Sequence, residues 1–343
     1  MTFVPNKVHL VGSVALDSAQ EVLSTAGKLL GRRLDRIPDG EPGGRRHWIA
    51  WQLPVLRASP YLMVAGETPA GGSSLCLANG VKPDDVQFGE LGYAREARPG
   101  YEDFLAAKKA GDISADTKFQ VALPTPLAVI SSYCAGEDLL TIERPYEKAM
   151  LNEVAAIVAA IPNDELCIQW DICHEMIMWD GQTTQWTPRQ FADPRLEVIS
   201  RVKRLAAAVP ERVELGLHLC YGDRDAKHFV DPRDTEKMTE FANVLSTAVA
   251  RKIAYIHMPV PIDRVDEAYF KPLAGLHLHP ETQVFLGLVH SDGPQATRAR
   301  IAAANKYVPR FGIATECGIA RKRTPALVRS LLEIHAQVSD EPH

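Results

Sequence analysis

The sequence has 343 residues, of which 46% are hydrophobic and 24% are charged, a composition typical of globular proteins and unlike that of disordered, collagen-like or disulfide-rich chains. The 38 Lys and Arg residues against 43 Asp and Glu residues give a net charge of −5, which does not favour nucleic-acid binding. No apolar run approaches the roughly 20 residues of a membrane span, and the first residues do not resemble a signal peptide. We therefore expect a cytoplasmic protein that acts on a small molecule, with no nucleic-acid or membrane partner, and a homo-oligomer is left open.

Apolar runs that are rich in β-branched residues, each followed by polar or turn-forming residues, predict β-strands. In chain order they cover residues 8–14, 34–39, 119–124, 166–171, 213–220, 253–259, 283–290 and 308–315. Apolar faces with helical period separate most of them, at residues 150–161, 196–205 and 238–249. The last helix is expected to begin with Thr324 as its cap and Pro325 at its first position. Alternating strands and helices predict a parallel sheet, and eight such units close a single (βα)8 TIM barrel of the α/β class.

The gap between the second and third predicted strands is too long for one crossover. It contains a predicted helix over residues 45–56 and a hairpin-like stretch, VQFGELGYAREA, at residues 86–97. We interpret about residues 42–118 as an insertion over the barrel mouth, within a single TIM-barrel catalytic domain of residues 1–343. Trp48 and Trp51 fit equally well in a lid that contacts a substrate and on the apolar face of an ordinary helix.

Polar and ionisable side chains follow the predicted strands at the end of the barrel where active sites form. Burying such groups is costly without partners, so their density favours a functional role for this end. They are Ser13, Asp39, Glu41, Thr125, Asp171, His174, Glu175, His218, Cys220, His257, His290, Asp292, Glu316 and Cys317.

The sharpest local signal is the pair His218 and Cys220, which lie two residues apart at the end of the fifth predicted strand and therefore point to the same side. Cys317 follows the eighth strand, whose mouth can converge with that of the fifth. One imidazole and two thiolates favour Zn²⁺, and three protein ligands leave a position open for a substrate. We predict a catalytic zinc site at these three residues; a binding protein with a purely structural zinc is the alternative.

Several motifs, in their order along the chain, resemble the catalytic barrel of cobalamin-independent methionine synthase. The chain is also similar to that enzyme's single-barrel relatives, such as epoxyalkane coenzyme M transferases, within the uroporphyrinogen-decarboxylase-like superfamily. The motifs are VGSV (11–14), DGEPGGRRHW (39–48), IQWD (168–171), HLCYGD (218–223), VHS (289–291) and ECGIARKR (316–323).

The resemblance implies a zinc-dependent methyl- or alkyltransferase in which a small thiol binds the metal as a zinc thiolate and attacks an alkyl carbon. It also implies that Gly12 and Ser13 contact the polar end of the thiol substrate, and that Glu41 and Asp171 bind or orient its amino group. His290 is implied as the acid that protonates a leaving group or acceptor.

Asp39, His174, Tyr133 and His257 complete the predicted substrate-binding residues. In the family, a glutamate after the sixth strand completes the zinc shell. His257 occupies that stretch here, and either it is an additional ligand or the site has only three. The tryptophan-bearing segment that faces folate in the family is replaced by residues 123–136, in which Tyr133 is the only aromatic residue.

These departures keep a second hypothesis open, a metal-assisted lyase or decarboxylase on the same barrel. In that hypothesis His290, Asp171 and Glu41 transfer protons, while the metal polarises a substrate oxygen.

Three further features favour structural interpretations. Cys173 follows a strand beside His174, where packing is favoured over a second metal pairing. The residues His277 and His279 precede the seventh strand, so we expect a solvated turn. The basic run at residues 321–323 is interpreted as a solvated loop in preference to a phosphate clamp.

Overall fold

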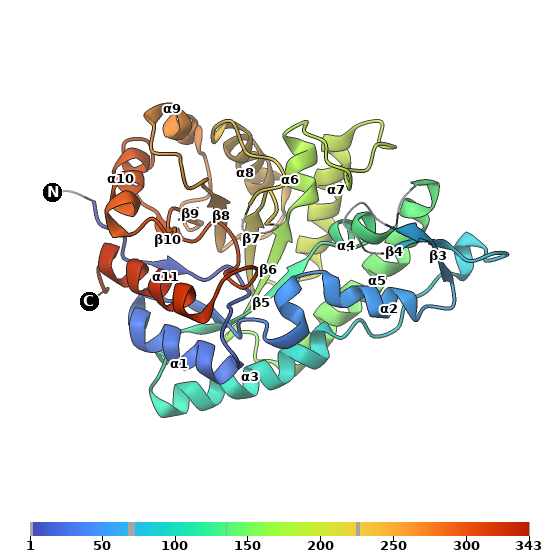
Figure 1. Ribbon diagram of the computed structural model, residues 1–343, viewed down its shortest axis with the longest axis horizontal. Coiled ribbons are helices and arrows are strands. Elements are labelled where there is room, and N and C mark those ends of the chain that lie inside the picture. The colour runs from blue at the N-terminus through green and yellow to red at the C-terminus, as the bar shows by residue number, and fades with distance from the viewer. Residues whose placement is uncertain (1–2, 68–72, 135, 224–226, 343) are drawn as a thin grey trace.

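A computed structural model of the chain describes residues 3–67, 73–134, 136–223 and 227–342. Within these residues, eight parallel strands form one sheet in the spatial order β1, β10, β9, β8, β7, β6, β5, β2 (Figure 1). The strands are β1 (Val8–His9), β2 (Arg36–Pro38), β5 (Lys118–Pro124), β6 (Leu166–Ile172), β7 (Glu214–Leu219), β8 (Tyr255–Pro259), β9 (Gln283–Gly287) and β10 (Gly312–Ala314). All eight predicted strands are present, although β1 and β10 are much shorter than their apolar runs.

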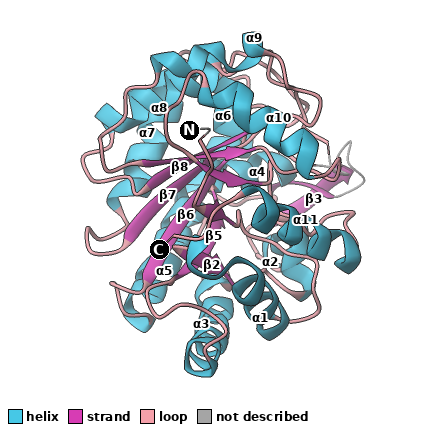
Figure 2. Ribbon diagram, turned by 90° about the vertical axis from the view of Figure 1, so that its left-hand side faces the viewer, coloured by secondary structure: helices cyan, strands magenta, loops and turns pink. Residues whose placement is uncertain are grey.

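Pairing at Val8 closes the sheet into a barrel. Val8 pairs with Ile313 of β10 on one side and forms a parallel bridge with Leu34, just before β2, on the other. Helices surround the strands on the outside (Figure 2). The predicted TIM barrel is therefore confirmed.

The long outer helices are α1 (Ala19–Leu30), α3 (Tyr93–Ala110), α5 (Leu139–Ala160), α7 (Pro194–Ala207), α8 (Glu236–Ala248), α10 (Pro294–Asn305) and α11 (Pro325–Val338), and the shorter ones are α2 (Leu53–Arg57), α4 (Pro126–Tyr133), α6 (His174–Trp179) and α9 (Glu267–Phe270). Thr324 caps α11 as predicted, because its hydroxyl accepts a hydrogen bond from the Leu327 amide at 3.2 Å. Leu196, which was predicted on a buried face, is 63% exposed.

Gln169 organises a polar layer inside the barrel. Its carbonyl oxygen accepts hydrogen bonds from His9 Nε2 at 2.9 Å and from the Tyr255 hydroxyl at 2.8 Å. Its amide nitrogen donates to the Val11 carbonyl at 2.6 Å and to Asp171 Oδ1 at 2.8 Å. Both polar atoms of this buried side chain are thus hydrogen-bonded, and the hydrogen bond from Gln169 fixes the position of the Asp171 carboxyl group.

The segment between β2 and β5 differs from the prediction in two respects. A single helix over residues 45–56 is wrong: the chain forms two 3-10 helices, Gly43–His47 and Ala50–Gln52, followed by α2. They are separated at Trp48, whose φ of 56° is incompatible with a right-handed helix. The hairpin-like stretch is also wrong, because the antiparallel hairpin lies earlier, in β3 (Leu62–Glu67) and β4 (Ser73–Leu77), beside α4 (Figure 1).

The second half of the stretch VQFGELGYAREA forms the beginning of α3 and not a strand. The carboxylate of Glu153, from a distant part of the chain, stabilises this helix start. Glu153 of α5 accepts hydrogen bonds from the amides of Leu91, Gly92 and Ala94, at 2.6, 3.1 and 2.6 Å. These donors would otherwise be unpaired at the start of the helix. Because α3 packs against α1 and α5, it serves as an outer helix of the barrel. The residues of this segment that line the cavity at the barrel mouth, such as Glu41 and Trp48, precede α3 in the chain.

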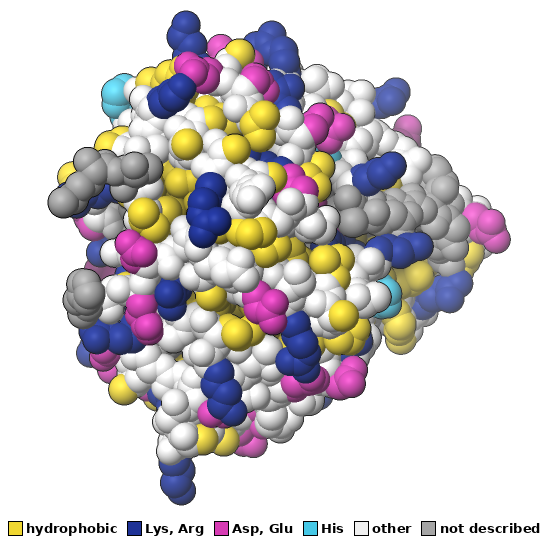
Figure 3. Space-filling model, turned by 60° about the vertical axis from the view of Figure 1, so that its left-hand side comes forward, with side chains coloured by type: hydrophobic (Ala, Val, Ile, Leu, Met, Phe, Trp, Pro, Cys, Tyr) yellow, Lys and Arg dark blue, Asp and Glu magenta, His cyan; other side chains and the backbone are white. Residues whose placement is uncertain are grey.

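The outer surface mixes charges of both signs. On the face shown in Figure 3, Lys and Arg side chains are interspersed with Asp and Glu side chains. Among the described helices, none has both the length and the apolar character that crossing a bilayer requires.

Candidate functional site

The carboxyl end of the barrel brings together His218 and Cys220 of the β7 exit with Cys317, which follows β10. Their ligand atoms all lie within 4.8 Å of one another, and the two Sγ atoms are 3.9 Å apart. All three residues are buried. Alternation along β7 and the closure of the barrel therefore produce the three-residue cluster that the sequence spacing predicted.

The donor set fits Zn²⁺. His218 Nε2 is buried and has no hydrogen-bond partner among the described residues. Its other ring nitrogen, Nδ1, lies 2.7 Å from Nδ1 of His257. Two thiolates on a tetrahedral zinc, each at about 2.3 Å from the ion, lie about 3.8 Å apart, close to the separation of the two Sγ atoms. A metal on Nε2 would leave the proton of the neutral His218 ring on Nδ1, from which it would donate a hydrogen bond to His257 Nδ1.

This arrangement places His257 behind His218. His257 is absent from the cluster of potential ligands, and its Nδ1 is directed at the His218 ring. A hydrogen-bond partner of this kind fixes the tautomer and orientation of a metal-binding imidazole.

The ionisation states of the cluster depend on a cation. Burial lowers the pKa of His218 well below its ordinary value, so the imidazole is neutral and able to bind metal. The neighbouring thiol of Cys173, with burial, raises the pKa of Cys220, and the Cys220 thiol together with burial raises that of Cys317. Without a cation both thiols stay protonated, whereas a bound divalent ion stabilises their thiolates.

The cluster forms one wall of a cavity, which we call the metal cavity. Glu41, Asp171 and Arg321 place ionisable groups around it. The cavity is lined by Val11, Gly12, Ser13, Glu41, Trp48, Asp171, Cys173, His218, Cys220, Gly222, Asp223, Cys317, Gly318 and Arg321. It therefore contains seven of the residues predicted to carry metal binding or catalysis, or to contact the thiol: Gly12, Ser13, Glu41, Asp171, His218, Cys220 and Cys317.

Burial dominates the electrostatics of the two carboxyl groups in the metal cavity. Burial raises the pKa of Glu41 to about 8, with a contribution from the nearby Asp171 carboxylate. Burial likewise raises the pKa of Asp171 to about 7, against a hydrogen bond from Gln169 that lowers it. Both groups can therefore exchange protons near neutral pH.

The wall of the metal cavity depends on a close approach between two segments and on unusual backbone angles. A side-chain carbon at Gly318 would lie 2.4 Å from Ser13 Oγ, so only glycine allows the Cys317 loop to approach the β1 exit. Glu41 and Trp48 have φ angles of 53° and 56°, in the left-handed region that residues other than glycine rarely adopt.

Other predicted residues lie elsewhere. His290 lines a different cavity, with Thr315 and Glu316, and its Nε2 donates to the Val260 carbonyl at 2.9 Å. Burial lowers the pKa of His290 to about 3. The adjacent residues Glu316 and Cys317 face these two different cavities, which separates His290 from the metal cluster.

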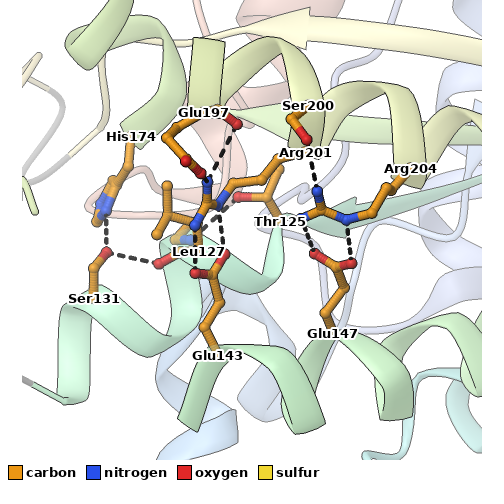
Figure 4. A network of polar contacts seen from close by, with 11 residues as sticks. Thr125, Leu127, Ser131, Glu143, Glu147, His174, Glu197, Ser200, Arg201 and Arg204 are labelled. Carbon is orange, nitrogen blue, oxygen red and sulfur yellow. Dashed lines mark hydrogen bonds and ion pairs between the residues drawn. The ribbon is translucent and has the colours of Figure 1, made fainter. Parts of the chain in front are cut away.

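His174, Tyr133 and Asp39 also lie outside the lining of the metal cavity. His174 Nδ1 is 2.6 Å from the Ser131 hydroxyl (Figure 4), and its ring stacks on Trp186. Tyr133 ends α4, where burial raises its pKa to about 12. Asp39 is ion-paired with Arg45 at 2.6 Å and belongs to a neighbouring compartment.

Arg321 and Asp223 are cavity residues that the sequence did not single out as such. Arg321 Nη2 lies 3.6 Å from Cys317 Sγ and 3.2 Å from Asp223 Oδ2. The solvated loop that the sequence predicts for the basic run is wrong for Arg321, because this side chain is only 16% exposed. Its position four residues after Cys317, a predicted metal ligand, was the one available signal. Cys173 and Trp48 also line the cavity.

Comparison with known proteins finds similarity in structure but not in sequence. No family model matches the chain, and no curated protein matches its sequence. A B12-independent methionine synthase from Shewanella sp. W3-18-1, in complex with selenomethionine, superposes with a TM-score of 0.62 at 15% identity over 98% of both chains. A putative vitamin-B12-independent methionine synthase from Listeria monocytogenes gives a TM-score of 0.57 at 14% identity, over 99% of this chain and 100% of that one.

A methyltransferase from Methanosarcina mazei gives a TM-score of 0.51 at 13% identity, over 97% of this chain and 94% of that one. At such identities the likeness is one of fold. It agrees, at that level, with the family resemblance of the sequence motifs.

Proposed function

We propose that the protein is a zinc-dependent methyl- or alkyltransferase that activates a small thiol. The observation that carries this proposal is the cluster of His218 Nε2, without a partner, and two thiols 3.9 Å apart at the wall of a cavity. The solved structures with the same fold support it, because two are named methionine synthases and one is named a methyltransferase.

His218, Cys220 and Cys317 would hold the metal. Bound Zn²⁺ supplies one open position in which a substrate thiol ionises near neutral pH and becomes nucleophilic. Ser13 lines the same cavity and would offer its hydroxyl to the polar end of the thiol substrate. Glu41 and Asp171 would orient an amino group or another donor, as either carboxylates or neutral acids.

Metal analysis tests the proposal directly. Protein purified without chelators is expected to contain about one zinc per chain, since the site supplies one set of three ligands. Cys220→Ala and Cys317→Ala should each lose the metal and any thiol alkylation. Cys76→Ala, in the half-buried strand β4 outside the cavity, is the matched control and should retain both.

Cobalt substitution adds a reading of the ligands. The Co²⁺ protein should show thiolate-to-metal charge transfer that changes when a small thiol is added, because the thiol enters the open position. A wild-type protein that binds no zinc even when it is supplied, or a closed four-ligand shell that no thiol perturbs, would overturn the proposal.

A metal-assisted lyase or decarboxylase is a second candidate. The observation that favours it is the pair of carboxyl groups, Glu41 and Asp171, with pKa values near neutrality in the metal cavity. The position of His290 in another cavity weakens it, because that hypothesis assigns His290 a proton. Turnover of a substrate at full rate without any thiol would establish the lyase and exclude the transferase.

A further inference from the structure

Each of the two cysteine sulfurs in the proposed metal site accepts a hydrogen bond from an N–H group. The backbone amide of Gly222 donates to Cys220 Sγ at 3.2 Å. The guanidinium of Arg321 donates to Cys317 Sγ at 3.6 Å, through Nη2. The two donors come from different loops, since Gly222 follows β7 and Arg321 follows β10. The thiol activation proposed above assigns no role to either donor.

The turn after β7 directs the Gly222 amide at Cys220. Gly222 has a φ of 88°, in the left-handed region, and a side-chain carbon there would lie 2.4 Å from the Phe229 ring. Glycine is therefore required for the turn that brings this amide to the sulfur two residues earlier. Because the donor belongs to the backbone, a side-chain substitution at position 222 cannot remove it without disturbing the turn.

A buried carboxylate fixes the guanidinium of Arg321. Asp223, whose side chain is only 2% exposed, lies in the loop after β7, and its Oδ2 is 3.2 Å from Arg321 Nη2. The same oxygen accepts a hydrogen bond from Arg323 Nη1 at 3.0 Å. Two guanidinium groups thus share one carboxylate. Within the described part of the chain, only that of Arg321 is also hydrogen-bonded to a cysteine sulfur.

A hydrogen bond to a thiolate lowers its nucleophilicity. The N–H donor stabilises the negative charge on the sulfur, and such a charge-assisted hydrogen bond is about twice as strong as a neutral one. Alkylation of a cysteine ligand would form a carbon–sulfur bond and convert the thiolate to a neutral thioether. Because a thioether sulfur is a weak acceptor, most of the hydrogen-bond energy would be lost in that product. A protein thiolate with such a donor therefore reacts more slowly than one without.

We propose that the N–H groups of Gly222 and Arg321 protect the two cysteine ligands from alkylation, so that the alkyl group goes to the substrate thiolate. This inference rests on the proposed function. In the productive reaction the substrate sulfur forms a bond to the alkyl carbon. The bond between that carbon and the leaving group breaks, and its electron pair stays with the leaving group. Cys220 and Cys317 remain thiolates, and Arg321 is a positioning residue that acts through Cys317.

Competitive alkylation of the zinc-loaded protein tests this inference. Methyl iodide is the probe, and mass spectrometry of a digest gives the ratio of methylation at Cys317 to methylation at Cys220. Arg321→Gln should raise this ratio by about 10-fold, because it removes a hydrogen bond to a charged group from Cys317 alone. Cys220 keeps its Gly222 donor and serves as the internal reference. A general loosening of the barrel mouth would expose both cysteines and would not change the ratio.

Arg323→Gln is the matched control. It removes the same charge from the same loop and from the same Asp223 oxygen, but Arg323 has no hydrogen bond to either sulfur among the described residues. The ratio should stay at the wild-type value. If Arg321→Gln does not fold, Arg321→Lys keeps a cation beside Asp223. Its shorter side chain should reach the carboxylate in preference to Cys317, and the ratio should rise by about threefold.

An unchanged ratio in the Arg321 variant, or an equal rise in the Arg321 and Arg323 variants, would overturn this inference. Either result would leave the zinc content and the cobalt spectrum of the wild-type protein, and with them the proposed transferase, untouched. A wild-type protein that binds no zinc even when it is supplied would refute the transferase and this inference together. Metal content therefore distinguishes the two failures.

Discussion

Two buried polar clusters of this barrel contrast in how completely they are hydrogen-bonded. Between α5 and α7, Arg201 donates to both oxygens of Glu143, at 2.6 and 2.7 Å, and to Glu197 at 2.6 Å (Figure 4). In the metal cavity, by contrast, several buried atoms have no partner among the described residues: His218 Nε2, Trp48 Nε1, Asp223 Oδ1 and Arg321 Nε.

The contrast distinguishes buried polar groups that stabilise the fold from buried polar groups that are available to a ligand. A buried charge with a fully matched partner stabilises the packing of two helices and needs nothing further. Buried donors and acceptors without partners cost free energy, and those that line a cavity can be completed there by a ligand. The following substitutions test whether this distinction holds.

The largest effect on stability is expected for Glu143→Ala. It leaves the buried guanidinium of Arg201 without its bidentate partner, which should lower the free energy of unfolding by about 3–5 kcal/mol. Glu147→Ala removes the analogous partner of the half-exposed Arg204, and should cost less than about 1 kcal/mol. Chemical denaturation measures both. Zinc content should be unchanged in each, and a loss of zinc would show that the two clusters are coupled.

A smaller effect, opposite in sign, is expected for Asp171→Asn. Because burial raises the pKa of Asp171 to about 7 in the folded protein, the folded state binds a proton more tightly than the unfolded state. The native stability contributed by this group is therefore present at low pH and lost as the pH rises from about 4 to about 7. Asn cannot ionise, so the variant should be more stable than the wild type above pH 7, by on the order of 2–4 kcal/mol.

Denaturation of metal-free protein at pH 5 and pH 8 measures this effect. The exposed Asp84→Asn is the control and should not alter the difference between the two curves. The raised pKa would be contradicted if the difference in unfolding free energy between Asp171→Asn and the wild type were the same at pH 5 and pH 8.

The smallest effect is expected for Tyr255→Phe in the polar layer below the cavity. The hydroxyl that donates to Gln169 is lost, but Gln169 Oε1 keeps its hydrogen bond from His9. The expected cost is about 1 kcal/mol of unfolding free energy, without an effect on zinc binding. A cost above about 3 kcal/mol would mean that the layer, although satisfied, is as critical as the Arg201 pair.

Local patterns in the sequence predict the barrel and the cluster of His218, Cys220 and Cys317. Each strand lies in an apolar run that must be buried on both faces, so its position follows from local composition alone. His218 and Cys220 share a side of β7 because side chains alternate along any strand. Cys317 follows the last strand, and closure of eight units brings that exit to the β7 exit.

The start of α3 depends on a contact between distant segments, because the Glu153 carboxylate that pairs the amides at its beginning comes from another helix. The same holds for His257, which contacts the His218 ring, and for His290, which lines a cavity apart from the cluster of His218, Cys220 and Cys317. These outcomes depend on contacts between segments far apart in the chain. Local patterns specify which face of an element is buried, but not which distant side chain completes its hydrogen bonds.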